Sequence, residues 1–297
     1  FINDGGTISI DETGLFNNTG QAEGMHIKTN ASFTNQNNGQ ILIGQGGAGS
    51  IEDDGIRIEE EATMINDNSI IRIDNIRGRA GIRLEESSSF TNKAGGQLYI
   101  GQLNPDINST NSIFNSIRTN DGNNQFINES CGEVYIYGEI GILNNDDSFS
   151  NAGYLFVDQD DAHENNATLT NTGIISYAQD NPIPSVSNTG FFLEPFSFED
   201  CEITNTLSLG NSNGFTIADT WYTDANLTQP IGSYLQSSNT FTLTNLPESS
   251  PTAIYFNASK DGCAILVETS LTISDFVSGQ VVWTGQENNN WHNSCNW

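Results

Sequence analysis

The sequence has 297 residues, long enough for two or three domains, and its 37 acidic and 9 basic residues give a formal net charge of −28. This charge disfavours nucleic acid and anionic membranes as partners, since both require clustered Lys or Arg. No run of about 18 consecutive apolar residues occurs, so we expect no membrane insertion in this segment.

A short triplet, an apolar residue followed by any residue and then Asn, recurs through the first half of the chain. After each copy come a few turn residues, usually including Gly, and then a stretch in which apolar and polar residues alternate, such as Gln40–Ile43. A second short strand stands between several copies, as at residues 24–27, 55–58 and 81–84. The copies end at Asn3, Asn35, Asn66, Asn92, Asn128, Asn151 and Asn171.

This pattern predicts an all-β fold, a parallel β-helix or β-solenoid of about seven coils over residues 1–180. One coil cannot bury its own apolar face, so equivalent residues stack on neighbouring coils about 4.8 Å apart. An Asn side chain both donates and accepts, so a column of them can bond along the axis. A sandwich of ordinary hairpins does not explain such columns. The predicted ladder is Asn35, Asn66, Asn92, Asn128, Asn151 and Asn171.

The second half has a different pattern. Residues 181–184, Asn-Pro-Ile-Pro, predict a break in the repeat. Longer strands with turns every 8–12 residues then predict an Ig-like β-sandwich over residues 181–278. Residues 279–297 are expected to be the truncated start of a further β-rich module, which makes the chain an internal piece of a longer protein.

Two stretches carry a resemblance. Trp221-Tyr222, Pro230-Ile-Gly232 and Gly262-Cys263 resemble an Ig-like module of large secreted Bacteroidota proteins, and the tail Trp283-Thr-Gly285 … Trp291 … Asn296-Trp297 resembles another signature of such proteins. The resemblance implies export, by the type IX route, to the cell surface or the extracellular space. It also implies that Trp221 is a central core residue.

The four cysteines lack the close spacing of a zinc site. A Cys201–Cys263 disulfide is expected, since Cys201 stands where the resembled module often has its partner cysteine. Buried free thiols are the alternative.

Arg57 and Arg83 hold equal positions in two copies of the short second strand, each followed by glutamates, and His26 holds the same position one copy earlier. We expect an exposed ladder in which each Arg pairs with Glu of its own or a neighbouring coil. The alternative is a lyase-type site, which needs a cation held by carboxylates and a basic residue beside it.

Two further candidates lie on the repeats. Asp158, Asp160 and Asp161 are oxygen ligands at loop spacing and are the predicted Ca²⁺ site; no other cofactor is expected. The other acidic clusters, at residues 52–54 and 146–147, are expected to be solvated loops. Tyr99, Tyr135 and Phe156 should point outward from successive coils, either as a carbohydrate platform or packed under a loop or a neighbouring chain.

These observations predict a structural and adhesive segment of an exported cell-surface protein, with no catalytic centre. Its expected partner is an extracellular glycan or surface polymer, or copies of itself, bound along an extended repeat surface. The alternative is a polysaccharide lyase or hydrolase whose site lies on the solenoid or in a missing domain.

Overall fold

The structure, a computed structural model, describes residues 1–11, 22–45, 51, 53–74, 76, 79–101, 116–120, 122–137, 142–144, 147–158, 164–165, 168–179, 182–198, 204–207, 214–245, 247 and 250–273. These residues divide into two compact units, the first of which ends at Phe192. No helix long and apolar enough to cross a membrane occurs among them.

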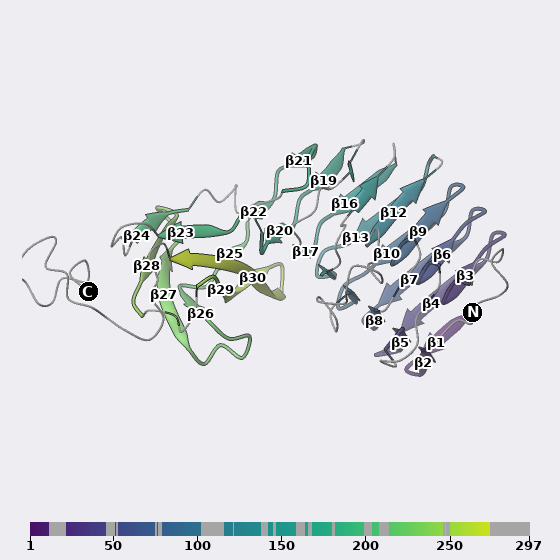
Figure 1. The fold of residues 1–297 in the computed structure, drawn as a ribbon, viewed down its shortest axis with the longest axis horizontal. Helices are drawn as coiled ribbons and strands as arrows, with labels where there is room; N and C mark the ends of the chain where they lie inside the picture. The colour runs from purple at the N-terminus through teal and green to yellow at the C-terminus, as the bar shows by residue number, and fades with distance from the viewer. Residues whose placement is uncertain are drawn as a thin grey trace, which may run out of the picture. The chain divides into compact units, whose positions relative to one another are not determined.

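The first unit is a β-solenoid built from three stacked parallel sheets (Figure 1). Sheet A contains the triplet strands, in the order β1 (Ile2–Asp4), β4 (Ser32–Gln36), β7 (Thr63–Asp67), β10 (Ser89–Asn92), β13 (Gln125–Asn128), β16 (Ser148–Asn151), β19 (Leu169–Asn171) and β21 (Val186–Asn188). The predicted parallel β-helix is therefore confirmed.

Sheet B follows sheet A along each coil. Its order is β2 (Thr7–Ile10), β5 (Gln40–Ile43), β8 (Ile70–Ile73), β11 (Gln97–Ile100), β14 (Glu133–Ile136), β17 (Tyr154–Val157), β20 (Ile174–Tyr177) and β22 (Phe191–Leu193). Sheet C precedes sheet A and contains β3 (Met25–Ile27), β6 (Ile56–Ile58), β9 (Ile82–Glu85), β12 (Ile117–Asn120), β15 (Ile142–Asn144) and β18 (Glu164–Asn165).

The apolar positions of all three sheets stack in register and form one core. In sheet A, Phe90 lies 5.1 Å from Phe126, which lies 4.6 Å from Phe149, ring centroid to ring centroid. The inward Ile and Leu side chains of sheets B and C from β6 onward are buried in the same core, whereas Ile8 and Ile10 at its N-terminal end are partly buried. Complete burial of one such side chain contributes about 1.5–3 kcal/mol, so each added coil gains stability from the coil below it.

The predicted asparagine ladder is confirmed. Each Asn donates from Nδ2 to Oδ1 of the Asn one coil further on, over 2.7–3.0 Å. Glycine in the following turn makes room for it: a Cβ atom at Gly132 would lie 2.4 Å from Oδ1 of Asn128 and 2.8 Å from the carbonyl oxygen of Asn92.

The stack continues past the predicted break. The backbone of β21 pairs with that of β19, and Asn171 donates to Asn188 over 2.8 Å. The expectation that the repeat stops near residue 180 is therefore wrong, because the Pro-containing segment lies between strands and leaves the register intact. Asn3 and Asn188 extend the ladder beyond the six predicted members.

The second unit is a single curled mixed β-sheet. Its order is β23 (Phe196–Phe198), β30 (Cys263–Ile273), β29 (Thr252–Lys260), β26 (Thr220–Tyr222), β27 (Pro230–Leu235), β28 (Thr240–Leu243) and β24 (Thr204–Thr206), and β25 (Thr216–Ile217) also pairs with β29. Only β23 and β30 pair in parallel among these described strands.

The curl of this sheet encloses an aromatic core. Phe196 on β23 and Phe241 on β28 are far apart in the strand order, yet their rings lie 5.4 Å apart. Trp221 is fully buried, as predicted; its ring contacts both of these rings and stacks on Phe256 at 4.1 Å. The all-β class predicted for this unit is confirmed, but its described strands are joined in one sheet where the prediction had two facing sheets.

Candidate functional site: the charged face of sheet C

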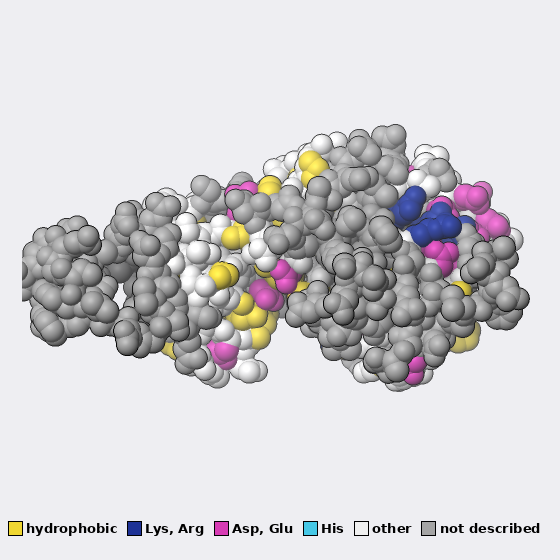
Figure 2. Space-filling model, viewed as in Figure 1, with side chains coloured by type: hydrophobic (Ala, Val, Ile, Leu, Met, Phe, Trp, Pro, Cys, Tyr) yellow, Lys and Arg dark blue, Asp and Glu magenta, His cyan; other side chains and the backbone are white. Residues whose placement is uncertain are grey.

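A column of basic side chains runs across the outer face of sheet C. His26, Arg57, Arg83 and Arg118 occupy equivalent positions on β3, β6, β9 and β12. Figure 2 shows Lys and Arg side chains gathered with Asp and Glu over the part of the solenoid that contains β3, β6 and β9. The equal positions predicted for His26, Arg57 and Arg83 are thus confirmed.

Carboxylates lie beside this column and pair with it. Arg57 contacts Glu59 of its own coil at 2.6 Å and Glu85 of the next coil at 2.8 Å. Arg83 pairs with Glu85, and His26 Nε2 lies 2.8 Å from Glu59. The predicted pairing of Arg with Glu of the same and neighbouring coils is confirmed.

The predicted exposure of these pairs is wrong. The side chains of Arg57 and Arg83 are only 12% and 8% exposed. Removing charges from water is costly, so a buried network is stable only when its charges are compensated and hydrogen-bonded. Burial lowers the pKa of Arg57, but the carboxylates of Glu85 and Glu59 outweigh this effect, and the pKa is raised overall.

Three further carboxylates converge at the start of the sheet C strands. One oxygen each from Glu23, Asp53 and Asp54 lies within 4.8 Å of the other two. The backbone positions them: the amide of Gly24 donates to the carbonyl of Asp54 over 2.9 Å, which places Glu23 in register with Asp54 on the next coil. We call these three residues the carboxylate triad.

The triad is poorly compensated by the arginines. Arg57 reaches Glu23 at 3.3 Å, Arg79 reaches Asp53 at 3.3 Å, and Arg83 reaches Asp54 at 3.4 Å. Charge-assisted N–H···O bonds are typically about 2.7–2.9 Å long, so these contacts are weak. The shorter contacts of Arg57 and Arg83 go to Glu59 and Glu85 instead.

The electrostatics agree with this geometry. Burial, and next the negative charge of Asp53, raise the pKa of Asp54 to about 6, although Arg83 opposes the shift. Burial also raises the pKa of Asp53, against the opposing charge of Arg79. Two neighbouring carboxylates of the triad therefore resist ionisation.

The sequence-based reasoning did not predict the triad: Glu23 was not singled out, and Asp53 and Asp54 were noted only as part of an acidic cluster. Asp53 and Asp54 belong to an acidic cluster expected to be a solvated loop, but both are buried. A signal for Glu23 was present, since Glu23-Gly24 and Asp54-Gly55 stand at the same place before the short second strand.

The aromatic column exists but is not an open platform. Tyr99, Tyr135 and Phe156 occupy equivalent positions on β11, β14 and β17, and the two tyrosine rings stack at 4.7 Å. Arg72 lies over the Tyr99 ring, with its Cζ atom 4.3 Å from the ring centroid. Tyr135 and Phe156 are buried, so the expected carbohydrate platform is wrong at these positions and the packed alternative holds.

The remaining candidates are only partly described. Asp158 is half-buried and its amide donates to the carbonyl of Ile136, while Asp160 and Asp161 lie outside the described residues, so the Ca²⁺ site there stays a prediction. Cys131 and Cys263 are both disulfide-bonded. Cys201 lies outside the described residues, and its pairing with Cys263 stays a prediction.

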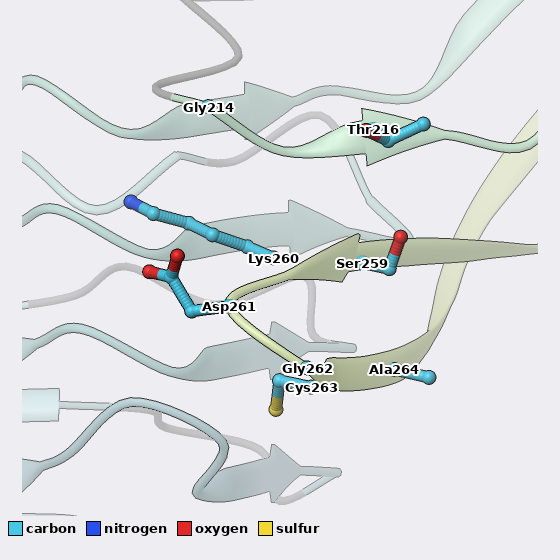
Figure 3. A pocket seen from close by; sticks show the side chains of 8 residues that line it. All are labelled: Gly214, Thr216, Ser259, Lys260, Asp261, Gly262, Cys263 and Ala264. Atoms are coloured by element: carbon cyan, nitrogen blue, oxygen red, sulfur yellow. The ribbon is translucent and has the colours of Figure 1, made fainter.

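A pocket lies at the β29–β30 hairpin of the second unit (Figure 3). Its lining includes Thr216, Ser259, Lys260, Asp261 and Cys263. Lys260 also lies over the ring of Phe215, 5.1 Å from its centroid. These side chains form no constellation of a nucleophile, a base and an orienting group, so sheet C remains the stronger candidate.

The fold and the site define an all-β protein with a β-solenoid, an asparagine ladder and a second unit made of one curled mixed sheet. Comparison of the chain with protein-family models, curated proteins and solved structures finds no match. Disulfides persist mainly in oxidising compartments, so the bonded state of Cys131 and Cys263 indicates a location outside the reducing cytoplasm.

Proposed function

We propose that the chain is a structural and adhesive segment of an exported cell-surface protein, and that it binds an extended extracellular polymer, such as a glycan, along its repeats. The resemblance of the second half to secreted Bacteroidota modules supports export. The observation that carries the proposal is the outer face of sheet A, where equivalent side chains line up from coil to coil and all remain at least partly exposed.

The outer face of sheet A is regular, and its central column is uncharged. This column consists of Thr34, Ile65, Thr91, Ile127, Ser150 and Thr170. At a spacing of about 4.8 Å between coils, it presents hydroxyl-bearing and aliphatic side chains in one line. A polymer with repeating units can contact many of them at once, and individually weak contacts then combine into useful avidity.

A surface substitution tests the proposal. The purified chain, Ile127→Glu and the matched control Ser130→Glu are assayed for binding to neutral and acidic polysaccharides. Ile127 is half-exposed on sheet A, whereas Ser130 lies in an exposed turn. Loss of about 1.4 kcal/mol, a tenfold weaker affinity, in Ile127→Glu alone supports the proposal. Equal binding by both variants contradicts it, and sedimentation that shows only self-association makes another copy of the chain the partner.

A second candidate function, a polysaccharide lyase or hydrolase, is favoured by one observation. The carboxylate triad and the arginines Arg57 and Arg83 lie together on sheet C, which matches the residue types of a lyase-type site. Incubation of the chain with the same polysaccharides, with and without Ca²⁺, tests it. Unsaturated or newly reducing ends that disappear in Arg57→Lys and Arg83→Lys favour the enzyme, whereas intact polymer favours adhesion.

A further inference from the structure

The charges around the carboxylate triad do not balance. Among the described residues, the ion pairs of this cluster join five carboxylates (Glu23, Asp53, Asp54, Glu59 and Glu85) to three guanidinium groups (Arg57, Arg79 and Arg83). The carboxylates in these pairs outnumber the guanidinium groups by two. Uncompensated buried charge is costly, so the cluster favours a further positive charge.

The excess negative charge is concentrated on the carboxylate triad. Glu59 and Glu85 have the close Arg contacts, and the contacts of Arg57, Arg79 and Arg83 to the triad are 3.3 Å or longer. Asp54 is fully buried, its Oδ2 has a long contact to Arg83, and its Oδ1 has no hydrogen-bond partner among the described residues. A buried carboxylate oxygen without a partner is rare in folded proteins, and here it belongs to a carboxylate that lies within 4.8 Å of two others.

We infer that Glu23, Asp53 and Asp54 form a binding site for one divalent cation of the calcium class. The ligands are all oxygens, which hard cations prefer, and the triad contains neither His nor Cys. Oxygens bound to one Ca²⁺ at about 2.3–2.6 Å lie at most about 5 Å apart, and the triad oxygens meet this limit. One divalent cation would supply the two missing positive charges.

The backbone makes the triad a preformed site. Successive coils stack closely at Gly24, Gly55 and Gly81, the first two of which directly follow Glu23 and Asp54. A Cβ atom at Gly24 would lie only 2.7 Å from the carbonyl oxygen of Gly55. The side chains of Glu23 and Asp53 retain 8% and 11% exposure. The ion would therefore enter from their side, and water would complete its coordination.

Calorimetric titration of the EDTA-treated chain with CaCl₂ tests the inference. The matched variants are Glu23→Gln, Asp54→Asn and, as the control, Asp67→Asn, an exposed carboxylate on sheet A. A fourth variant, Asp158→Asn, reports on the other acidic loop. In Glu23→Gln and Asp54→Asn, we expect the affinity of one Ca²⁺ site to fall at least about tenfold, the size of effect seen when a group that supports a metal is lost. The other two variants should bind Ca²⁺ like wild type.

Several results would overturn the inference. One is the absence of Ca²⁺ binding by the wild-type chain, measured both by heat and by a shift of the melting temperature. Another is equal binding by Glu23→Gln, Asp54→Asn and the control, which would place the ion elsewhere. Tighter binding of Zn²⁺ than Ca²⁺ at the site would exclude the calcium class. Circular dichroism verifies the fold of each variant, and Glu23→Gln decides the question if Asp54→Asn does not fold.

Discussion

Asn92 donates from Nδ2 to Oδ1 of Asn128, 36 residues further along the chain, over 2.9 Å. The same amide also donates to the carbonyl oxygens of Gly96 and Glu133, and Asn92 accepts from Asn66. One buried side chain therefore joins successive coils and the turn between sheets A and B.

Replacement of Asn92 by Ala should destabilise the solenoid strongly. The change removes the donor to the buried Oδ1 atom of Asn128, while Nδ2 of Asn66 keeps the carbonyl oxygens of Ser69 and Gln97 as acceptors. The carbonyl oxygens of Gly96 and Glu133 also lose this donor, and each unsatisfied buried group costs about 1–3 kcal/mol. We expect the free energy of unfolding to fall by about 2–4 kcal/mol, measured by denaturant titration. Gln125→Ala, an exposed position on the next coil, should change it by less than about 0.5 kcal/mol. Similar effects of the two changes would mean that the ladder adds little.

The repeat could be predicted because each copy contains the residues that set the register of its strand. Each triplet carries both the inward apolar residue and the ladder Asn, so spacing between copies is irrelevant and loops of any length are tolerated. Asn188 was not predicted as a ladder member for the same reason. Val186-Ser187-Asn188 is a weak triplet, because Val replaces the usual Phe and two prolines stand shortly before it. Nothing local marks it as another coil until its pairing with β19 is seen.

The candidate site was harder to predict because it depends on contacts between coils. Glu23 and Asp54 lie 31 positions apart, and only the stacking of Gly24 on Gly55 brings them together. The local sequence does not show which side chains are buried either. Alternation placed Tyr135 and Phe156 on the outer face correctly, but alternation does not show whether an outer face is covered.

Replacement of Gly55 by Ala should disturb the start of sheet C. A Cβ at this position would lie 2.5 Å from Cγ2 of Ile73 and 2.6 Å from the carbonyl oxygen of Gly81. Overpacking of this kind costs about 1–3 kcal/mol, and the backbone oxygen cannot move without breaking the coil contact. Ser130→Ala is the comparison, because Ser130 lies in an exposed turn and the change adds no atom to the contacts between coils. A Gly55→Ala protein as stable as wild type in calorimetric melting would show that the coils are not tightly stacked here.

Replacement of Asp54 by Asn should stabilise the metal-free protein at neutral pH. The pKa of Asp54 is raised to about 6 in the folded chain, from 3.8 as its ordinary value. The protonated form therefore favours folding: this contribution is fully present below the unfolded pKa of 3.8 and is lost as the pH rises through the folded pKa of about 6. Asn imitates the protonated acid at every pH, so it keeps that contribution.

The expected gain at neutral pH is up to about 3 kcal/mol, from about two pKa units at 1.36 kcal/mol each. The gain in stability should vanish below pH 3.8, the ordinary pKa of the carboxyl group. Unfolding curves of wild type and Asp54→Asn in EDTA, from below this pH to neutral pH, measure the gain. A variant that is less stable than wild type at neutral pH would show that Arg83 compensates Asp54 more fully than the long contact indicates.

In the second unit, Trp221→Phe should cost less than Trp221→Ala. The indole is fully buried, stacks on Phe256, and donates from Nε1 to the carbonyl of Ala218 over 3.0 Å. Truncation to Ala leaves a large cavity and should cost about 3–5 kcal/mol. Phe retains the stacking but loses the hydrogen bond and some volume, for about 1–3 kcal/mol. Leu235→Ala, at an exposed position, is the control. The measurement is the shift of the unfolding transition of the second unit in each variant.

Replacement of Arg57 by Met should be among the most damaging single changes on sheet C. Arg57 contacts Glu59, Glu85 and Glu23, and its removal leaves three carboxylates in a largely buried setting without that charge. Breaking a buried pair by deleting one partner costs about 3–5 kcal/mol, far more than the net stability of the intact pair. Met preserves much of the volume of the Arg stem, so packing loss contributes little.

Arg79→Met is the matched control for this change. Its side chain is 46% exposed and reaches Asp53 only at 3.3 Å, so solvent screens its charge and the cost should stay below about 1 kcal/mol. Thermal unfolding of both variants at neutral pH measures the two costs. Equal stability of Arg57→Met and Arg79→Met at neutral pH would contradict a buried network, because Arg57 is the more buried of the two and makes the shorter carboxylate contacts.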